Sequence, residues 1–393
     1  MAVGLDFKFD RAWAEIDLDA LAHNIREIRK ITSKESEVMG VVKADAYGHG
    51  VAQVSQTLLE NGATRLAVAT LDEAVQLRQK GFKVPVLILS YTDTSRSEEL
   101  ILNDITQAVF DIETAKVLSQ AAVKLQKNVK IHIKLDTGMT RVGFIPGEQA
   151  VEEIIAISKL PGIIVEGMFT HFASADETDK SYTYMQFGKY MDTNRQLEGK
   201  GLHIPLKHVC NSAGIMDFPE MHLDMVRAGI ILYGLYPSQE VDKSRIALKP
   251  VMSFKAKVTL VKEVESDTCI SYGRTFRTAR KSRIATIPVG YADGYARLLS
   301  NKGRALVNGE EAPVVGRVCM DQCMLDITDF KNEVAVGDTA VLFGRQGGME
   351  ISMDEVAGKI GTITYEVACQ IGKRIPRVYM RGGEVCGVLN YLI

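Results

Sequence analysis

A lysine stands where a long apolar run of the chain ends. Residues 38–43 are Val-Met-Gly-Val-Val-Lys, and a glycine-rich turn, residues 44–50, follows at once. Such a run predicts a strand buried on both faces, which would place Lys43 at the rim of a sheet or barrel. Burial disfavours the ammonium form, and a neutral amine can attack an aldehyde and form a Schiff base. The alternative is a lysine that extends from a strand end to water.

Other residues capable of chemistry follow later apolar runs. They are Lys134, Asp136, Arg141, His171, Asn211, Ser212, Arg227 and Gly229. If these runs are parallel strands of one barrel, their carboxyl ends meet at one mouth. The set contains an amine, an imidazole, two guanidiniums and a Ser-Ala-Gly turn. These groups suit a phosphorylated aromatic cofactor that carries a carbonyl. The Ser212 hydroxyl and backbone N–H groups near Gly229 can hold a phosphate.

Each of these residues also has a plainer interpretation. His171 can be a hydrogen-bonded core residue, and Arg141 can be a surface ion-pair partner. Asp136 can cap a turn, and Lys134 can pair with a neighbouring acid. The convergence of the whole set, rather than any one member, favours a cofactor site.

The order of predicted elements indicates what positions these residues. Apolar runs alternate with helical patterns over roughly the first 230 residues. This alternation predicts an α/β fold with an N-terminal (β/α)8 TIM-type barrel. A doubly wound open sheet is the alternative, disfavoured because no G-x-G-x-x-G turn opens an early helix. The predicted strands are 38–43, 65–70, 84–90, 106–111, 129–136, 163–171, 206–211 and 226–232, and the helices are 17–31, 71–81, 111–126 and 180–199.

The pattern changes near Pro250, where strand-like runs begin to follow one another. We therefore expect domains at 1–245 and 246–393, the second mainly β. Turn signals at 308–309 and 347–348 separate several of its runs. The predicted strands are 251–262, 283–289, 313–318, 323–327, 339–343 and 377–380, with one helix at 353–360 after Ser352.

Composition narrows the class of protein. The 393 residues are 46% hydrophobic and 24% charged, with a net charge of −2, which favours a soluble protein that binds neither nucleic acid nor a membrane. The first residues lack a signal-peptide pattern, and no apolar run is long enough to span a bilayer. Six scattered cysteines without a Cys-x-x-Cys pair predict buried free thiols in the cytoplasm. Cys319 and Cys323 have the wrong spacing for zinc, and no metal is expected.

Five motifs together resemble the bacterial alanine racemases, a pyridoxal-phosphate-dependent family, nearly end to end. The lysine motif spans residues 42–50, with Asp45 where asparagine is more usual. The others are Ser-Tyr-Gly within 270–275, Gly-Tyr-Ala-Asp-Gly-Tyr at 290–295, Cys-Met-Asp-Gln within 316–322 and Thr-Tyr-Glu at 364–366. The lysine motif is moderately specific alone, and joined to Ser-Tyr-Gly and Cys-Met-Asp-Gln it is strong. Taken singly, Tyr272 and Tyr291 can also be half-buried strand aromatics.

The resemblance implies an alanine racemase that interconverts L- and D-alanine by a two-base mechanism and supplies D-alanine for peptidoglycan. Lys43 would act on the D-enantiomer, and Tyr272 of a partner subunit on the L-enantiomer, in a homodimer with shared active sites. A free phenol has a pKa near 10, so Tyr272 needs a nearby cation in order to lose its proton near neutral pH. His171 paired with Arg227 is the candidate for relaying that charge.

The resemblance also assigns binding residues. Arg227 can only donate a hydrogen bond to the cofactor's pyridine nitrogen, which should limit side reactions. Lys134 occupies a position that is carbamylated in some members. Pyridoxal 5′-phosphate would be bound by Lys43, Tyr47, Arg141, His171, Asn211, Ser212, Arg227, Gly229, Ile230 and Tyr365, and the substrate by Arg141, Met320, Asp321 and Tyr291.

Three alternatives remain beside this assignment. A racemase for serine or a basic amino acid is disfavoured by Tyr365, which indicates a narrow pocket. A decarboxylase of similar architecture would carry a glycine-triplet phosphate loop and a cysteine motif, and neither is present. A non-catalytic carrier of pyridoxal phosphate would lack the region after Pro250 and with it Tyr272.

Overall fold

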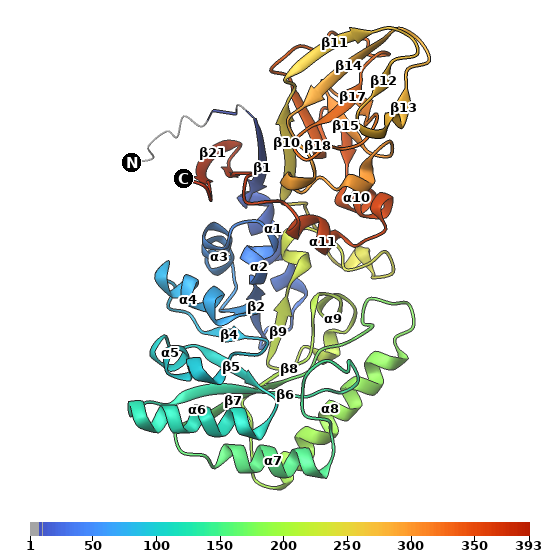
Figure 1. Ribbon diagram of the computed structural model, residues 1–393. Helices are drawn as coiled ribbons and strands as arrows, with labels where there is room; N and C mark the ends of the chain where they lie inside the picture. Colours follow the sequence, from blue (N-terminus) through green and yellow to red (C-terminus); the bar gives the residue numbers. More distant parts are fainter. Residues whose placement is uncertain (1–7, 10) are drawn as a thin grey trace. The chain divides into compact units, whose positions relative to one another are not determined.

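The computed structural model describes residues 8, 9 and 11–393, which divide into two compact units (Figure 1). The barrel unit contains residues 21–46 and 51–249. The second unit contains residues 47–50, residues 250–393 and the described residues up to 20. The predicted fold class, an α/β barrel with a mainly β region, is confirmed.

Eight parallel strands form the barrel, and they pair in the order β8-β7-β6-β5-β4-β3-β2-β9. Backbone hydrogen bonds from Asp224 to Lys207 (3.1 Å) and from Arg227 to Cys210 (3.0 Å) join β8 to β9 and nearly close the ring. All eight predicted strands are present, because strands buried on both faces give continuous apolar runs. They are β2 (Glu37–Val41), β3 (Arg65–Val68), β4 (Val86–Ile88), β5 (Thr106–Val109), β6 (Val129–Lys134), β7 (Ile163–Phe169), β8 (Leu206–His208) and β9 (Met225–Ala228).

Helices lie outside this ring of strands (Figure 1). Two hydrogen bonds fix the start of helix α4. The Thr70 hydroxyl accepts the Glu73 N–H (3.3 Å), and the Glu73 carboxylate accepts the Thr70 N–H (3.2 Å). This reciprocal capping box satisfies two N–H groups that the helix leaves unpaired. The helices are α1 (Leu18–Ile31), α3 (Val51–Glu60), α4 (Leu71–Gln79), α5 (Ser97–Leu102), α6 (Ile112–Leu125), α7 (Glu148–Ser158), α8 (Ser181–Gly199) and α9 (Ser212–Asp217).

The second unit is mainly β. Its largest sheet has the order β16-β15-β18-β10-β1-β20-β21, with β19 paired to β18, beside a sheet β11-β14-β17 and a ribbon β12-β13. Helix α10 (Met353–Ile360) begins after Ser352, as predicted, and α11 (Thr364–Cys369) was not predicted. The strands are β1 (Ala12–Asp17), β10 (Met252–Lys257), β11 (Leu260–Val264), β12 (Cys269–Ile270), β13 (Phe276–Arg277), β14 (Ser282–Ile287), β15 (Arg304–Val307), β16 (Glu310–Pro313), β17 (Cys323–Asp326), β18 (Thr339–Gln346), β19 (Met349–Ile351), β20 (Arg377–Arg381) and β21 (Glu384–Leu389).

Two strands of this unit differ from expectation. Strand β1 was not predicted; it pairs antiparallel with β10 and parallel with β20. The domain ranges 1–245 and 246–393 took no account of that pairing and stay a prediction. The strand expected at 313–318 is wrong, because Asn308 and Gly309, with φ of 51° and 81°, form the turn of a hairpin that ends β16 at Pro313.

The six cysteines are free thiols. Cys210 and Cys323 are buried as predicted, whereas the prediction is wrong for Cys369 and Cys386, which are exposed. In the part of the chain that the structure describes, no helix has the length and apolarity to cross a membrane.

Candidate active site

Lys43 begins a left-handed turn directly after β2. The four residues that follow it, 44–47, have φ between 52° and 55°, so α2 (Lys43–Tyr47) is one turn of left-handed helix. Each L-residue in this conformation costs about 1–2 kcal/mol. Such strain persists only where the surroundings hold it, and it concentrates at functional sites.

Two carboxylates hold this turn. Glu73 accepts the Ala44 N–H (2.6 Å) in addition to capping α4, and Asp45 accepts the Val51 N–H (2.8 Å). An asparagine oxygen can accept that second bond as well, so the departure from the family's usual residue preserves it. Glu73 was not among the predicted site residues, although the spacing of Thr70 and Glu73 is the signature of a capping box.

A glycine at position 44 is expected to stabilise the protein. Ala44 is exposed with φ of 52°, so Ala44→Gly relieves backbone strain without loss of buried surface. We expect the free energy of unfolding to rise by about 1 kcal/mol, measured by urea denaturation. The matched control is Ala156→Gly on the exposed face of α7, which should lower it by about 1 kcal/mol. A loss of stability at both positions would contradict strain at Ala44.

Lys134 ends β6 and is buried, with 4% of its surface exposed. Its Nζ lies 4.8 Å from the centre of the Phe169 ring. Burial, together with the charges of Arg227 and Arg141, lowers the pKa of Lys134 well below its ordinary value. Among the described residues no ion pair joins Lys134 to a carboxylate, and Asp136 acts on it only through its charge, so the alternative that it pairs with an acid is wrong.

Asp136 organises the loop that carries Arg141. Its carboxylate accepts backbone N–H groups from Gly138 (3.0 Å), Thr140 (2.9 Å) and Arg141 (2.9 Å). Burial opposes ionisation, yet these hydrogen bonds outweigh it and lower the pKa of Asp136. The plainer interpretation of Asp136 as a turn cap is therefore confirmed. Arg141 itself is exposed.

Arg227 in β9 is a fixed, buried donor, 3% exposed. Its terminal nitrogens donate to the carbonyls of Thr170 (2.8 Å), His208 (3.0 Å) and Val209 (3.1 Å). Burial lowers the pKa of Arg227 to about 10, which leaves it protonated at neutral pH. The geometry fixes the plane of the guanidinium.

Several of the predicted barrel residues act electrostatically on His171. Its Nδ1 lies 3.4 Å from Nη2 of Arg227. Burial, and then the positive charges of Arg227, Lys134, Arg141 and Lys43, lower its pKa well below the ordinary value. The imidazole is therefore neutral, and the fixed charge of the His171–Arg227 pair belongs to the arginine.

The predicted phosphate-binding groups of the barrel also meet. The Ser212 hydroxyl accepts the Gly229 N–H (3.1 Å) between the start of α9 and the end of β9, directly before Ile230. Asn211 caps α9 by accepting the Gly214 N–H (2.9 Å), a structural role that sequence analysis did not assign. Cofactor contacts by these residues stay predictions.

In the second unit, Tyr272 is 71% exposed on a strained turn. Three residues around it have positive φ: Ser271 (66°), Gly273 (71°) and Arg274 (50°). The Ser271 hydroxyl donates to the Arg317 carbonyl (2.7 Å) and fixes the turn on the segment that follows Gly316.

Tyr291 lies next to this segment, which also contains Met320. The Tyr291 N–H donates to the Cys319 carbonyl (3.0 Å), and the Cys319 Sγ lies 3.5 Å from the Ser271 hydroxyl. A Cβ at Gly290 would lie 2.2 Å from that carbonyl, so only glycine permits the approach. The structure thus gathers the Tyr272 turn, Tyr291 and Met320 around Cys319.

The remaining predicted residues of this unit are tied to local partners. Asp321 forms an ion pair with Arg374 (2.8 Å). The rings of Tyr47 and Tyr365 lie 6.2 Å apart, and burial, with Tyr365 and Cys369 nearby, raises the pKa of Tyr47. The Tyr47 hydroxyl therefore stays protonated and can donate.

Comparisons with known proteins agree with this arrangement. The family description "Alanine racemase, N-terminal domain" matches residues 16–237, and the corresponding C-terminal domain matches residues 251–379. An alanine racemase from Clostridium perfringens is 51% identical over 380 residues, which cover 97% of this chain and 98% of that protein. The chain belongs to the alanine racemase family. The predicted family is thereby confirmed, and with it the enzyme class, a pyridoxal-phosphate-dependent amino-acid racemase.

Solved structures extend the comparison. The alanine racemase of Clostridium difficile 630 has a TM-score of 0.95 and 45% identity, covering 98% of this chain and 100% of that one. A histidine racemase from Leuconostoc mesenteroides subsp. sake has a TM-score of 0.88 and 31% identity, covering 95% and 99% of the two chains. The alanine racemase fold is thus shared by an enzyme named for another substrate.

Proposed function

We propose that this chain is an alanine racemase whose pyridoxal 5′-phosphate is held at the mouth of the barrel. The observation that carries the proposal is the convergence of four basic side chains, Lys43, Lys134, Arg141 and Arg227, on His171. Such a set suits an anionic cofactor with an aldehyde. The 51% identity to an alanine racemase supports alanine as the substrate.

The donor chemistry fits the cofactor group by group. A lysine amine at Lys43 can bind the aldehyde, the flat ring can stack on His171, and Arg227 can donate to the ring nitrogen. Arg141 can bind the phenolic oxygen. The proposed contacts to the phosphate and its surroundings are Tyr47, Asn211, Ser212, Gly229, Ile230 and Tyr365.

Racemisation needs a proton removed from one face of Cα and another delivered to the opposite face. Bound pyridoxal phosphate supplies an electron sink that makes the Cα proton acidic. We propose that Lys43 Nζ exchanges the proton of D-alanine and the Tyr272 hydroxyl that of L-alanine, because two fixed groups serve two faces better than one mobile base. The exposure of Tyr272 suits a residue that serves a partner copy in a two-fold dimer.

Arg227 is proposed to limit side reactions of the substrate. A guanidinium keeps its proton at neutral pH and can only donate, so it does not deliver a proton to the cofactor ring. The proton lost at Cα would then return from Lys43 or Tyr272 rather than reach the ring, and transamination should be a minor side reaction.

Substrate choice follows from the size of the proposed pocket. Arg141 is the proposed partner of the carboxylate, and Tyr291, Met320, Asp321 and Tyr365 are proposed to line or narrow the site. Each added methylene costs roughly 1–3 kcal/mol in such a pocket, so the preference for alanine should be strong but not absolute. The histidine racemase similarity makes another amino acid the second candidate.

The test is a substrate comparison with the purified protein and added pyridoxal phosphate. L-alanine should lose optical rotation and yield D-alanine faster than D-serine, D-lysine or D-histidine is racemised. Faster turnover of any of these would overturn the assignment to alanine. Carbon dioxide release from ornithine or diaminopimelate would favour a decarboxylase instead. We further propose that the enzyme works in the cytoplasm and supplies D-alanine for peptidoglycan.

Lys134 is expected to carry a carbamate. The lowered pKa of Lys134 favours the neutral amine, which can attack carbon dioxide and lose a proton, and the resulting anion would lie among the charges of Arg227 and Arg141. Protein equilibrated with ¹³C-bicarbonate should show a carbamate carbon signal by NMR that Lys134→Gln lacks. Removal of bicarbonate should lower activity in the parent but not in the variant. A signal that persists in Lys134→Gln would assign the carbamate elsewhere.

A further inference from the structure

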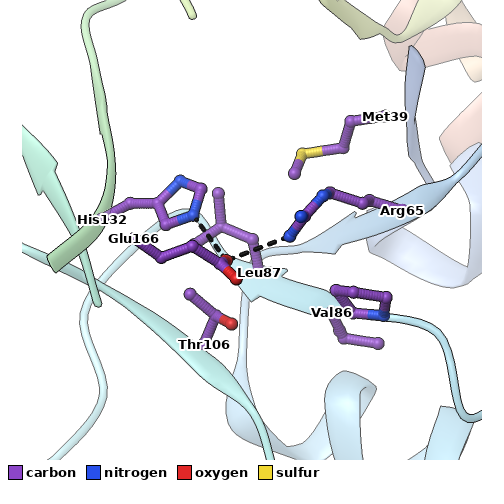
Figure 2. Close-up of a pocket in the computed structure, with 8 residues that line it drawn as sticks. Met39, Arg65, Val86, Leu87, Thr106, His132 and Glu166 are labelled. Atoms are coloured by element: carbon purple, nitrogen blue, oxygen red, sulfur yellow. Dashed lines mark hydrogen bonds and ion pairs between the residues drawn. The ribbon is translucent and has the colours of Figure 1, made fainter. Parts of the chain in front are cut away.

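A chain of four polar side chains runs through the interior of the barrel. Arg227 Nη1 lies 3.1 Å from Nδ1 of His208, and Nε2 of His208 lies 2.8 Å from Nδ1 of His132. Nε2 of His132 lies 3.1 Å from a carboxylate oxygen of Glu166 (Figure 2). Both histidines are 1% exposed or less. This relay links β9, β8, β6 and β7.

The chemistry of its two ends fixes the direction of every hydrogen bond in the relay. A guanidinium can only donate, so Nδ1 of His208 accepts and its proton is on Nε2. That proton is donated to His132 Nδ1, which places the His132 proton on Nε2, where it is donated to Glu166. Both imidazoles are therefore neutral, with one tautomer each.

Glu166 anchors the relay away from the proposed site. It pairs with Arg65 (3.0 Å; Figure 2). It also pairs with Lys130 (3.3 Å), and Arg65 pairs in addition with Glu37 (2.8 Å). These partners lie at the amino ends of their strands, whereas Lys43 follows the carboxyl end of β2. Burial opposes ionisation, but the hydrogen bond from His132 and the charge of Arg65 lower the pKa of Glu166 to about 2. It is a permanent acceptor.

The backbone makes room for this relay. The register between β6 and β7 shifts between Ile131 and His132, which sets His132 beside Gly167. A Cβ at Gly167 would lie 2.6 Å from the His132 ring, so glycine lets the imidazole lie across β7 towards His208. Branched apolar side chains usually fill the interior of such a barrel. Because apolar residues would be no less stabilising than a buried polar chain, its presence favours an orienting role.

We propose that Glu166 is a positioning residue for racemisation, because it accepts the Nε2 proton of His132 and so holds, from the far end of the relay, the tautomers that Arg227 selects and the position of Arg227 itself. This inference rests on the proposed function. Glu166 touches neither substrate nor cofactor, and its effect reaches the site only through the two rings and the guanidinium.

The first experiment reads the tautomers and requires no turnover. Full-length protein with ¹⁵N-labelled imidazoles contains only seven histidines, which makes assignment by single substitutions practical. At neutral pH the ring nitrogen shifts should show His132 and His208 neutral and protonated on Nε2. A proton on Nδ1 of either ring, or a doubly protonated ring, would overturn the relay whether or not the protein racemises alanine.

The second experiment tests whether Glu166 acts by positioning the relay or only as an ion-pair partner of Arg65. Glu166→Gln offers His132 an amide that can donate as well as accept, so a second tautomer of His132 should appear. We expect kcat for alanine to fall about tenfold with a nearly unchanged KM, and transamination per turnover to rise. The matched control, Glu37→Gln, removes the other carboxylate of Arg65 without touching the relay and should keep kcat within about twofold. Equal losses in the two variants would contradict the proposal.

A third variant displaces the ring while the carboxylate stays. Gly167→Ala should shift His132 and reproduce the fall in kcat and the rise in transamination seen with Glu166→Gln. A folded Gly167→Ala protein with parental kcat and transamination would overturn the positioning role. Absence of racemase activity in the parent protein would instead contradict the proposed function, and the nitrogen shifts would still decide the relay.

Discussion

Replacement of Lys43 by alanine is expected to abolish alanine racemisation. The proposal gives this amine two tasks, binding the cofactor aldehyde and exchanging the proton of D-alanine, and a methyl group can do neither. The rate of D-alanine formation should therefore fall by at least about 10⁴-fold. The same variant should lose the absorbance band of the covalently bound cofactor, measured on the purified protein.

The control for this variant replaces a lysine on the surface of the protein. Lys200→Ala, at the exposed end of α8, should leave both activity and absorbance unchanged. Added methylamine should restore part of the turnover of Lys43→Ala, because a small amine can occupy the space left by the side chain. Retention of the bound-cofactor absorbance band in Lys43→Ala would remove Lys43 from the centre of the mechanism.

Replacement of Tyr272 by phenylalanine should stop proton exchange on one face of the substrate Cα and leave exchange on the other face. The ring is 71% exposed, so loss of the hydroxyl should not disturb folding. Racemisation should fall about 10²–10⁴-fold, while the covalent cofactor signal remains. In deuterium oxide, the Cα proton of D-alanine should still exchange through Lys43, whereas that of L-alanine should not, measured by proton NMR.

Tyr91→Phe, at a tyrosine that is 58% exposed, is the matched control and should racemise at the parental rate. Exchange of the L-alanine Cα proton at the parental rate in Tyr272→Phe would contradict the assignment of this face to Tyr272.

Mixing the two inactive variants tests the shared dimer. If Tyr272 serves the partner's site, a mixed dimer of Lys43→Ala and Tyr272→Phe subunits contains one intact site. Equal mixing makes half of the dimers mixed, so about a quarter of the parental activity should return. No recovery after verified subunit exchange would mean that Lys43 and Tyr272 serve the same subunit.

The barrel could be predicted because burial on two faces leaves a continuous apolar signal in each strand, and Lys43, Lys134 and His171 follow such signals. Strand β1 escaped prediction because its residues 12–14 and 16 are all buried, which erases the alternation expected of a half-buried strand. The left-handed turn at 44–47 leaves no composition signal, since two of its residues are alanine.

The relay through the barrel could not have been predicted from the sequence. His132, Glu166 and His208 belong to three strands, and each alone has the plain interpretation of a polar residue in an apolar run. Only the register of β6 against β7, and the absence of a side chain at Gly167, bring the two rings together. The role of Asp136 was left open between site residue and turn cap for a similar reason, because its three N–H donors follow from loop geometry.

The central claim is that the cofactor is bound covalently through Lys43 Nζ, and borohydride reduction tests it most directly. Tritiated borohydride should fix the cofactor permanently to the purified protein, and peptide mapping should find the label on the peptide that contains Lys43. A label on another lysine, or no label on a protein that racemises alanine, would contradict the account.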